Sequence, residues 1–332
     1  MPIIAKTKKN SKGIAICGMV GLAATFLSRQ YGGPQLLYAL MFGLALHFLM
    51  EIPDITPGIN FCAKTVLRIG VALLGVRITI SEISTIGYKT ALVVGLGMCL
   101  TILLGTILAK LMKRKIDEGF LTGASVGICG ASAAMAVASI LPQTKENERY
   151  TLMVIVGVTL LSTLTMICYP ILINMTSLTL QQQGIFLGGT IHDVAQVVAA
   201  GMMISQQSAD SATVVKLFRV MLLMPAVLGI SYFYSKYSQK KVNRPSKSTT
   251  IPLFLLFFLL FVALSSFNTF DKKMIGLASD LSKWCLVLAI AAAGIKTSFK
   301  DLVLLGWTPV VMLLTETIFI ATFVLAGIYV TI

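Results

Sequence analysis

The segment 188–201 reads GGTIHDVAQVVAAG and places the polar residues His192, Asp193 and Gln196 inside a long apolar stretch. An ionisable side chain in the hydrocarbon of a bilayer is costly, and such residues usually line a substrate or ion path. His192 and Gln196 are four residues apart, so we expect them to share one helix face. His192 and Asp193 are adjacent and point apart, so we expect them to act separately. This segment is the first candidate for the working site.

The residue types suggest separate roles within this segment. We expect Thr190, His192 and Gln196 to bind substrate, and Asp193, together with His192, to couple an ion. Histidine titrates near neutral pH, whereas a buried aspartate binds a cation, carries a proton or neutralises a base. The alternative is an ordinary hydrogen-bonded pair between helices that serves packing alone.

Two deep cations and one deep acid follow later in the chain. Lys216 and Arg219, in VVKLFRVMLLMP, are three residues apart and therefore on one helix face. Such close like charges need a counter-charge, and Asp193 and a bound anion are the two candidates. The alternative is snorkelling of the long side chains to the membrane interface. Glu316, in LLTETIF, is expected to carry a proton or to pair with a buried base.

These groups must be positioned by membrane-spanning helices. Of the 332 residues, 56% are hydrophobic and only 12% are charged, and the mean hydropathy is +0.88. Apolar stretches of about 17–25 residues, the length that crosses a bilayer, recur along the chain. We therefore expect an all-α, polytopic membrane protein of 10–11 helices. The expected spans are 13–30, 34–50, 63–80, 89–112, 119–141, 149–173, 185–205, 212–235, 250–268, 278–297 and 306–331.

The formal net charge of +14 comes from basic clusters between the apolar stretches, at 6–12, 110–115 and 236–247. All three clusters lie on one side if eleven spans are counted, which is the positive-inside pattern of a membrane protein. We therefore expect a multi-pass membrane protein with a cytoplasmic amino terminus. The partner of these charges is the lipid bilayer, and no nucleic acid is expected.

We expect a single transmembrane domain over 1–332, with approximate halves 1–174 and 175–332 and a basic cytoplasmic loop at 236–249. That loop is too short for a soluble domain.

An internal repeat supports the two halves. GVRITISEISTIG at 75–87 aligns without gaps with GIKTSFKDLVLLG at 294–306. The two copies run in opposite directions across the membrane in the expected topology, so inverted repeats of the kind seen in secondary transporters are predicted. Chance similarity between apolar segments is the alternative.

A second segment, GASVGICGASAAMA at 123–136, resembles 188–201 in its small residues. In one interpretation its glycines allow close packing of a continuous helix. In the other, both helices break, and the amino termini of the half-helices bind an anion. The second interpretation adds a group of substrate-binding candidates, namely Ser125, Gly127, Cys129 and Gly130.

No enzyme, cofactor or metal site is predicted. Gly123 to Gly127 formally match the G-x-S-x-G nucleophile motif, but that chemistry needs a strand followed by a tight turn. The six cysteines are scattered singly, without a C-x-x-C pair, and are expected to fill apolar space.

Four motifs together resemble the YeiH-like bacterial membrane protein family (uncharacterised protein family 0324), often labelled sulfate exporters. They are LRIGVALLGVRIT, GASVGICGASAAMA, GGTIHDVAQVVAAG and KLFRVMLLMP, and the likeness covers nearly the whole chain. That family is distantly similar to the cation/proton antiporter and anion transporter superfamily. The resemblance implies inverted repeats and crossed, broken helices, which would map onto 123–136 and 188–201.

We therefore expect a secondary transporter of a small anion, such as sulfate, sulfite or an organosulfonate. It would be coupled to H⁺ or Na⁺, work by alternating access and associate as a homo-oligomer. An anion channel and a membrane scaffold or sensor are the alternatives.

Overall fold

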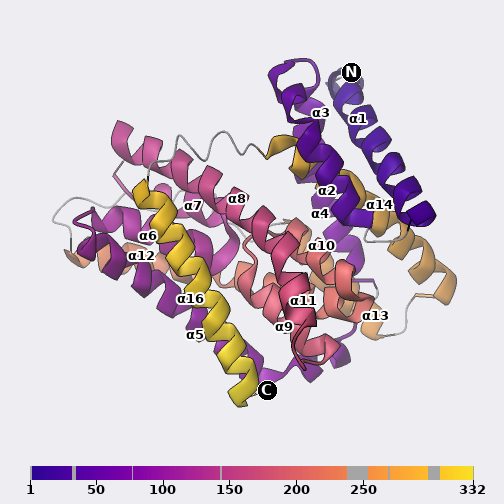
Figure 1. Cartoon of the computed structure of the whole chain (residues 1–332). Coiled ribbons are helices and arrows are strands. Elements are labelled where there is room, and N and C mark those ends of the chain that lie inside the picture. Colours follow the sequence, from indigo (N-terminus) through magenta and orange to yellow (C-terminus); the bar gives the residue numbers. More distant parts are fainter. Residues whose placement is uncertain are drawn as a thin grey trace. The chain divides into compact units, whose positions relative to one another are not determined.

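The computed structural model describes residues 2–31, 35–76, 78–142, 144–237, 253–267, 270–297 and 307–331. Within these ranges the chain is a series of helices joined by short turns, without a strand (Figure 1). The prediction of an all-α polytopic protein is confirmed.

Seven described helices are long and apolar enough to cross a membrane, as judged by length and composition. They are Asn10–Tyr31, Thr56–Leu74, Gly87–Leu111, Lys145–Asn174, Gln206–Phe233, Lys273–Lys296 and Trp307–Thr331. Three apolar helices are shorter: Gln35–Ala45, Val194–Ile204 and Leu256–Ser266. Two of the expected spans, 119–141 and 185–205, are each divided into two helices.

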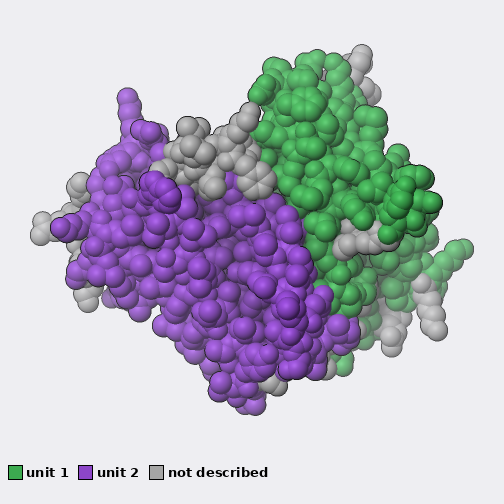
Figure 2. Space-filling model, in the orientation of Figure 1, with its two compact units in different colours: residues 1–85, 198–206, 252–298 green, residues 86–197, 207–251, 299–332 purple. Residues whose placement is uncertain are grey.

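The chain forms two compact units, each assembled from segments distant in sequence (Figure 2). The first unit comprises 1–85, 198–206 and 252–298, and the second comprises 86–197, 207–251 and 299–332. The expected halves, 1–174 and 175–332, do not coincide with these units, because each unit takes segments from both halves.

The first unit is a bundle of helices in which α14 has the most neighbours. It contains α1 (Pro2–Tyr31), α2 (Gln35–Ala45), η1 (His47–Glu51), α3 (Thr56–Phe61), η2 (Cys62–Val66), α4 (Leu67–Leu74), α13 (Leu253–Ser266) and α14 (Lys272–Lys296). A β-carbon at Gly43 of α2 would lie 2.4 Å from the Ala291 carbonyl oxygen, so α2 and α14 touch through their backbones. Nearby, His47 Nδ1 donates to the Ile295 carbonyl oxygen at 2.8 Å, a packing role.

The second unit holds the polar residues of interest. It contains α5 (Ile80–Leu111), α6 (Ile116–Ala124), the π-helical segment η3 (Ser125–Cys129), α7 (Ala131–Ala138), α8 (Lys145–Asn174), α9 (Leu180–Thr190), the first turn of α10 (Val194–Ile204), α11 (Gln206–Met221), α12 (Leu223–Tyr237) and α16 (Trp307–Thr331). Gly87, at φ 77° and ψ 161°, interrupts α5 beside the boundary between the units. Helix α16 packs against α6, η3, α8 and α9 and so carries its side chains into the centre of this unit.

Small residues bring α5 and α6 into backbone contact. A β-carbon at Gly105 would lie 2.5 Å from the Gly119 carbonyl oxygen, and one at Gly119 would lie 2.4 Å from the Gly105 carbonyl oxygen. Close approach of this kind is how helices associate where lipid removes the hydrophobic driving force. This contact fixes the distance between α5 and α6.

Parts of the predicted repeat and of the basic loop lie outside the described residues. These are Arg77 in the first copy, 298–306 in the second copy and 238–249 of the loop. The inverted repeat therefore stays a prediction.

We expect Gly105→Ala to destabilise the second unit by about 1–3 kcal/mol, because the added methyl group forces α5 and α6 apart. The matched control is Gly95→Ala on the same helix, where a β-carbon would meet nothing within 4 Å. The control should be neutral or slightly stabilising, since alanine is the better helix former. Thermal unfolding in detergent measures both variants, and equal shifts would contradict the close contact.

Candidate functional site

The segment 188–201 is not one helix. A capping box formed by Thr179 and Gln182 starts α9, which ends at Thr190. The next residues, 191–193, are not helical, and α10 begins at Val194. The expectation that His192 and Gln196 share one helix face is therefore wrong, because His192 lies in the break and Gln196 lies beyond it.

The segment 123–136 is also broken. Helix α6 runs into the five-residue π-helical segment η3, and Gly130 then turns the chain before α7 starts. Gly130 has φ 62° and ψ −129°, a conformation that only glycine adopts without strain. Its N–H donates to the Ser125 carbonyl oxygen at 2.8 Å and closes the last turn. Both segments are therefore broken, as the second interpretation expects, and anion binding at the amino termini of the half-helices stays a prediction.

Two buried cations hold the carboxyl ends of the first half-helices. Arg219 donates to the carbonyl oxygens of Val126 at 2.8 Å, Gly127 at 2.7 and 3.0 Å, Gly188 at 3.1 Å and Ile191 at 3.2 Å. Arg219 thereby joins η3 to the end of α9.

Lys216, one turn earlier on α11, joins the same two ends. Its ammonium group donates to the carbonyl oxygens of Ile128 at 2.7 Å and Ile191 at 3.0 Å. Both cationic side chains are fully buried, so the snorkelling alternative is wrong.

Asp193, one of the two expected counter-charges, does not pair with these cations, and the bound anion stays a prediction. Neither Lys216 nor Arg219 forms an ion pair with Asp193 or with any other described acid. Instead they meet the carbonyl ends of two half-helices, which carry partial negative charge. The cations therefore face the carboxyl ends of η3 and α9. The sequence interpretation instead concerned the amino ends of the half-helices, which it expected to bind the anion.

His192 links the two breaks to α16. Its Nδ1 lies 3.3 Å from the Val126 carbonyl oxygen, and its Nε2 lies 3.1 Å from the Thr317 hydroxyl oxygen. A carbonyl oxygen only accepts, so Nδ1 carries the proton, and in the neutral ring Nε2 accepts from Thr317. The imidazole is fully buried.

Asp193 and Gln196 face α8 instead. The Asp193 carboxylate accepts from the Ala195 N–H at 2.8 Å and caps α10, while the Asp193 N–H donates to the Ser162 hydroxyl at 3.0 Å. The Gln196 amide donates to the Thr163 hydroxyl at 2.8 Å. As expected from their adjacency, His192 and Asp193 contact different partners.

The small polar candidates are satisfied within their own helices. The Ser125 hydroxyl donates to the Leu121 carbonyl oxygen, and the Thr190 hydroxyl donates to the Phe186 carbonyl oxygen. Both hydroxyl groups are buried, as is Cys129. Of this group, Gly127 contributes a backbone acceptor to Arg219, and Gly130 contributes the turn between η3 and α7.

Glu316 lies nearby on α16 and is fully buried. Its Oε1 accepts from the Thr122 hydroxyl at 2.7 Å, and its Oε2 has no hydrogen-bond partner in the part of the chain that the structure describes. Because the next residue, Thr317, contacts His192, α16 touches both broken segments at adjacent positions.

Sequence reasoning missed the hydroxyl residues that line this centre. They are Thr122 on α6, Ser162 and Thr163 on α8, and Thr317 on α16. Ser162 and Thr163 could have been found from the sequence TLLSTLT at 159–165, where hydroxyl residues cluster within an apolar span. No comparable sequence pattern marks Thr122 or Thr317.

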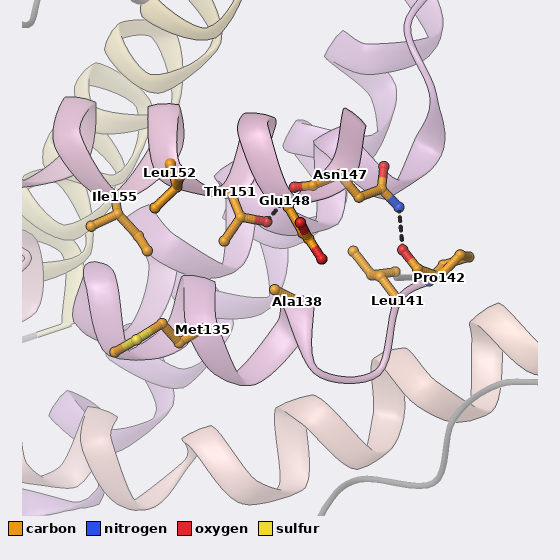
Figure 3. A pocket seen from close by; sticks show the side chains of 9 residues that line it. All are labelled: Met135, Ala138, Leu141, Pro142, Asn147, Glu148, Thr151, Leu152 and Ile155. Atoms are coloured by element: carbon orange, nitrogen blue, oxygen red, sulfur yellow. Dashed lines mark hydrogen bonds between the residues drawn. The ribbon is translucent and has the colours of Figure 1, made fainter. Parts of the chain in front are cut away.

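A separate cavity of about 300 Å³ lies between the end of α7 and the start of α8. Figure 3 shows Glu148 and Asn147 on one side of it, with Met135 and Ala138 on the other. Its lining contains a carboxylate but no cation. It does not fit an anion site, and the buried cations of α11 do not line it.

We expect Arg219→Met to lower the stability of the protein by about 3–5 kcal/mol, because it leaves buried carbonyl oxygens from two helix ends without donors. Arg149→Met, on the exposed start of α8, is the matched control and should change little. Thermal unfolding in detergent distinguishes them. Equal midpoints would show that Arg219 does not hold the broken ends together.

The comparisons with known proteins agree on the family. A family model described as "Conserved hypothetical protein 698" matches residues 12–313. A UPF0324 membrane protein of Chlorobaculum tepidum is 48% identical over 95% of this chain and 88% of its own length. The UPF0324 membrane protein TauZ of Paracoccus denitrificans is 43% identical over 96% of this chain and 94% of its own length. The chain therefore belongs to the UPF0324 family of membrane proteins.

Proposed function

We propose that this protein is a secondary transporter of a small anion. The observation that carries the proposal is the pair of fully buried cations, Lys216 and Arg219, at the point where two broken helices end. Buried charge in a membrane protein is costly and usually marks a transport path. The protein would act without covalent chemistry, as a non-enzyme in the bacterial cell membrane.

The charges near the breaks leave a positive excess. The carboxyl ends of η3 and α9 each carry roughly half a negative charge, and the amino ends of α7 and α10 each carry roughly half a positive charge. These helix contributions cancel. Lys216 and Arg219 add two positive charges and Asp193 removes one, so about one positive charge is uncompensated while His192 and Glu316 are neutral.

The cations supply the field, and other groups would contact the anion. Arg219 makes five hydrogen bonds and the Lys216 ammonium makes two of its possible three, all of them to carbonyl oxygens. Further N–H groups are offered by the first turn of α7, which begins directly after η3 and carries the exposed Ser132. Helix amino termini bind sulfate, phosphate and carboxylate groups readily. We place the anion there, within the positive field of α11.

The family resemblance and this chemistry both support the proposed substrate class. A small oxyanion such as sulfate or sulfite, or an organosulfonate, presents several acceptor oxygens to backbone N–H groups. Coupling to H⁺ or Na⁺, alternating access, a cytoplasmic amino terminus and a homo-oligomeric state are parts of the same proposal.

The test is uptake into proteoliposomes that contain the purified protein. Radiolabelled sulfate, sulfite and taurine would be supplied outside, under an inward proton gradient, an inward sodium gradient or no gradient. We expect saturable uptake of at least one anion that a gradient accelerates. Flux that does not saturate would favour a channel, and no flux of any anion under any gradient would overturn the proposal in favour of a scaffold or sensor.

A matched pair of variants tests the role of the buried charge. Lys216→Gln keeps a donor for the Ile128 carbonyl oxygen but removes the positive charge. We expect it to weaken the apparent affinity for the transported anion about tenfold, or ~1.4 kcal/mol. Lys145→Gln, at the exposed start of α8, removes the same charge from the surface and should leave the affinity unchanged. Equal affinities for both variants would contradict the proposed field.

A further inference from the structure

Among the described residues of the second unit, Glu316 is the buried carboxyl group that lacks both a cation and a full set of hydrogen bonds. Among the described residues, no Lys, Arg or His lies within ion-pair distance of it, and only Thr122 donates to it. The other carboxyl oxygen, Oε2, is buried and has no hydrogen-bond partner within the described part of the chain. Because an isolated carboxylate pays a large desolvation cost in such a place, the neutral acid is the favoured form.

The surroundings of Glu316 leave little room for a water shell. A β-carbon at Gly105 of α5 would lie 2.7 Å from Glu316 Oε1, so the backbone of α5 closes one side. Tyr150 of α8 lies within electrostatic range of Glu316, and His192 of the α9–α10 break contacts the adjacent Thr317; neither is a permanent cation. The cations Lys110 of α5 and Lys145 and Arg149 of α8 are exposed and form no ion pair with Glu316, and α9 carries no titratable group.

We propose that Glu316 is a proton-binding site whose occupancy is coupled to that of the anion at the helix breaks. The coupling rests on the proposed transport function, whereas proton binding itself does not. An ionised Glu316 would cancel the uncompensated positive charge at the breaks, so it competes with the anion. By linkage, anion binding favours proton uptake to the same extent, and the two ions cross together.

The structure also contains a mechanical connection for this coupling. Glu316 contacts Thr122 on α6, and the adjacent Thr317 contacts His192 between α9 and α10. A change in the charge of Glu316 therefore acts at both broken segments through one turn of α16. Both segments are also bonded to Arg219, so they respond together.

A line of polar side chains leads from Glu316 to one end of the second unit. Arg114, Glu118 and Thr122 follow one another at intervals of four residues. Arg114 donates to both carboxyl oxygens of Glu118, at 2.7 and 2.8 Å. The Arg114 side chain is 40% exposed, whereas that of Glu118 is 3% exposed. The Tyr150 hydroxyl lies within electrostatic range of both Glu118 and Glu316.

This line assigns a side to proton entry. Arg114 belongs to the basic cluster at 110–115, which the positive-inside pattern places in the cytoplasm. We infer that protons reach Glu316 from that side, past Glu118 and Tyr150.

Infrared difference spectroscopy of the full-length protein in lipid tests proton binding without a ligand. We expect the C=O stretching band of a protonated carboxylic acid at neutral pH, where exposed carboxyl groups are ionised. Glu316→Gln, which preserves the size of the side chain, should remove the band. Glu148→Gln, on the exposed part of α8, is the matched control and should retain it. A band that persists in Glu316→Gln would overturn the proposal.

A second variant keeps this test decisive if Glu316→Gln fails to fold. Thr122→Val removes the hydrogen bond to Oε1 and keeps the side-chain volume. It should shift the frequency of the same band and leave its intensity unchanged. An unshifted band would show that the protonated group is not Glu316.

Transport of sulfate tests the coupling. In proteoliposomes, wild-type protein should accumulate labelled sulfate under an inward proton gradient, and Glu316→Gln should lose this accumulation but still exchange sulfate between the two sides. Accumulation by Glu316→Gln at the wild-type level would overturn the coupling. If wild-type protein moves no sulfate, sulfite or taurine, the transport function fails, and the infrared result still decides the proton site.

Discussion

The second unit depends on the contact between two buried cations and the carbonyl ends of two broken helices. A helix that stops inside an apolar interior leaves terminal carbonyl groups that hydrocarbon cannot satisfy. Arg219 meets this need for η3 and α9 at once, because its planar guanidinium group presents several donors in a rigid fork. Lys216 adds a compact charge to the same two ends. Both interruptions are therefore possible because α11 lies beside them.

The same contact separates two roles: the cations supply positive charge, and other groups are left to donate hydrogen bonds to an anion. The cations make the centre electropositive, and seven hydrogen bonds from them already go to backbone oxygens, so an anion bound as proposed would feel their field without replacing these hydrogen bonds. The chain restarts as α7 and α10 immediately after the bonded ends. Helix amino termini, two buried cations and the buried acid Glu316 therefore all belong to the centre of this unit. His192 joins this centre to α16 through Thr317.

Some features of the site could be predicted from the sequence and others could not. Glycine content located both helix breaks, since glycine weakens a helix wherever it occurs in numbers. The spacing of Lys216 and Arg219 placed them on one face of α11. Their partners were missed because these are backbone carbonyl oxygens, which every residue carries and no side-chain pattern marks. The prediction that His192 and Gln196 share one helix face was wrong because Asp193 caps a new helix between them. The sequence did contain a signal for this helix start, since an Asp is followed three residues later by a Gln.

By itself, the sequence determined the class of protein, the approximate position of most spans and the identity of the deep charged residues. These follow from hydropathy, length and charge, which are local properties of the chain. Only the tertiary structure decided what the charges contact, because Arg219 and Gly127 are 92 residues apart and meet only when α11 packs against η3. It also decided that Glu316 keeps one oxygen without a hydrogen-bond partner among the residues that the structure describes. Satisfaction of a buried polar group depends on all of its neighbours in space, and these come from α5, α6 and α16 together.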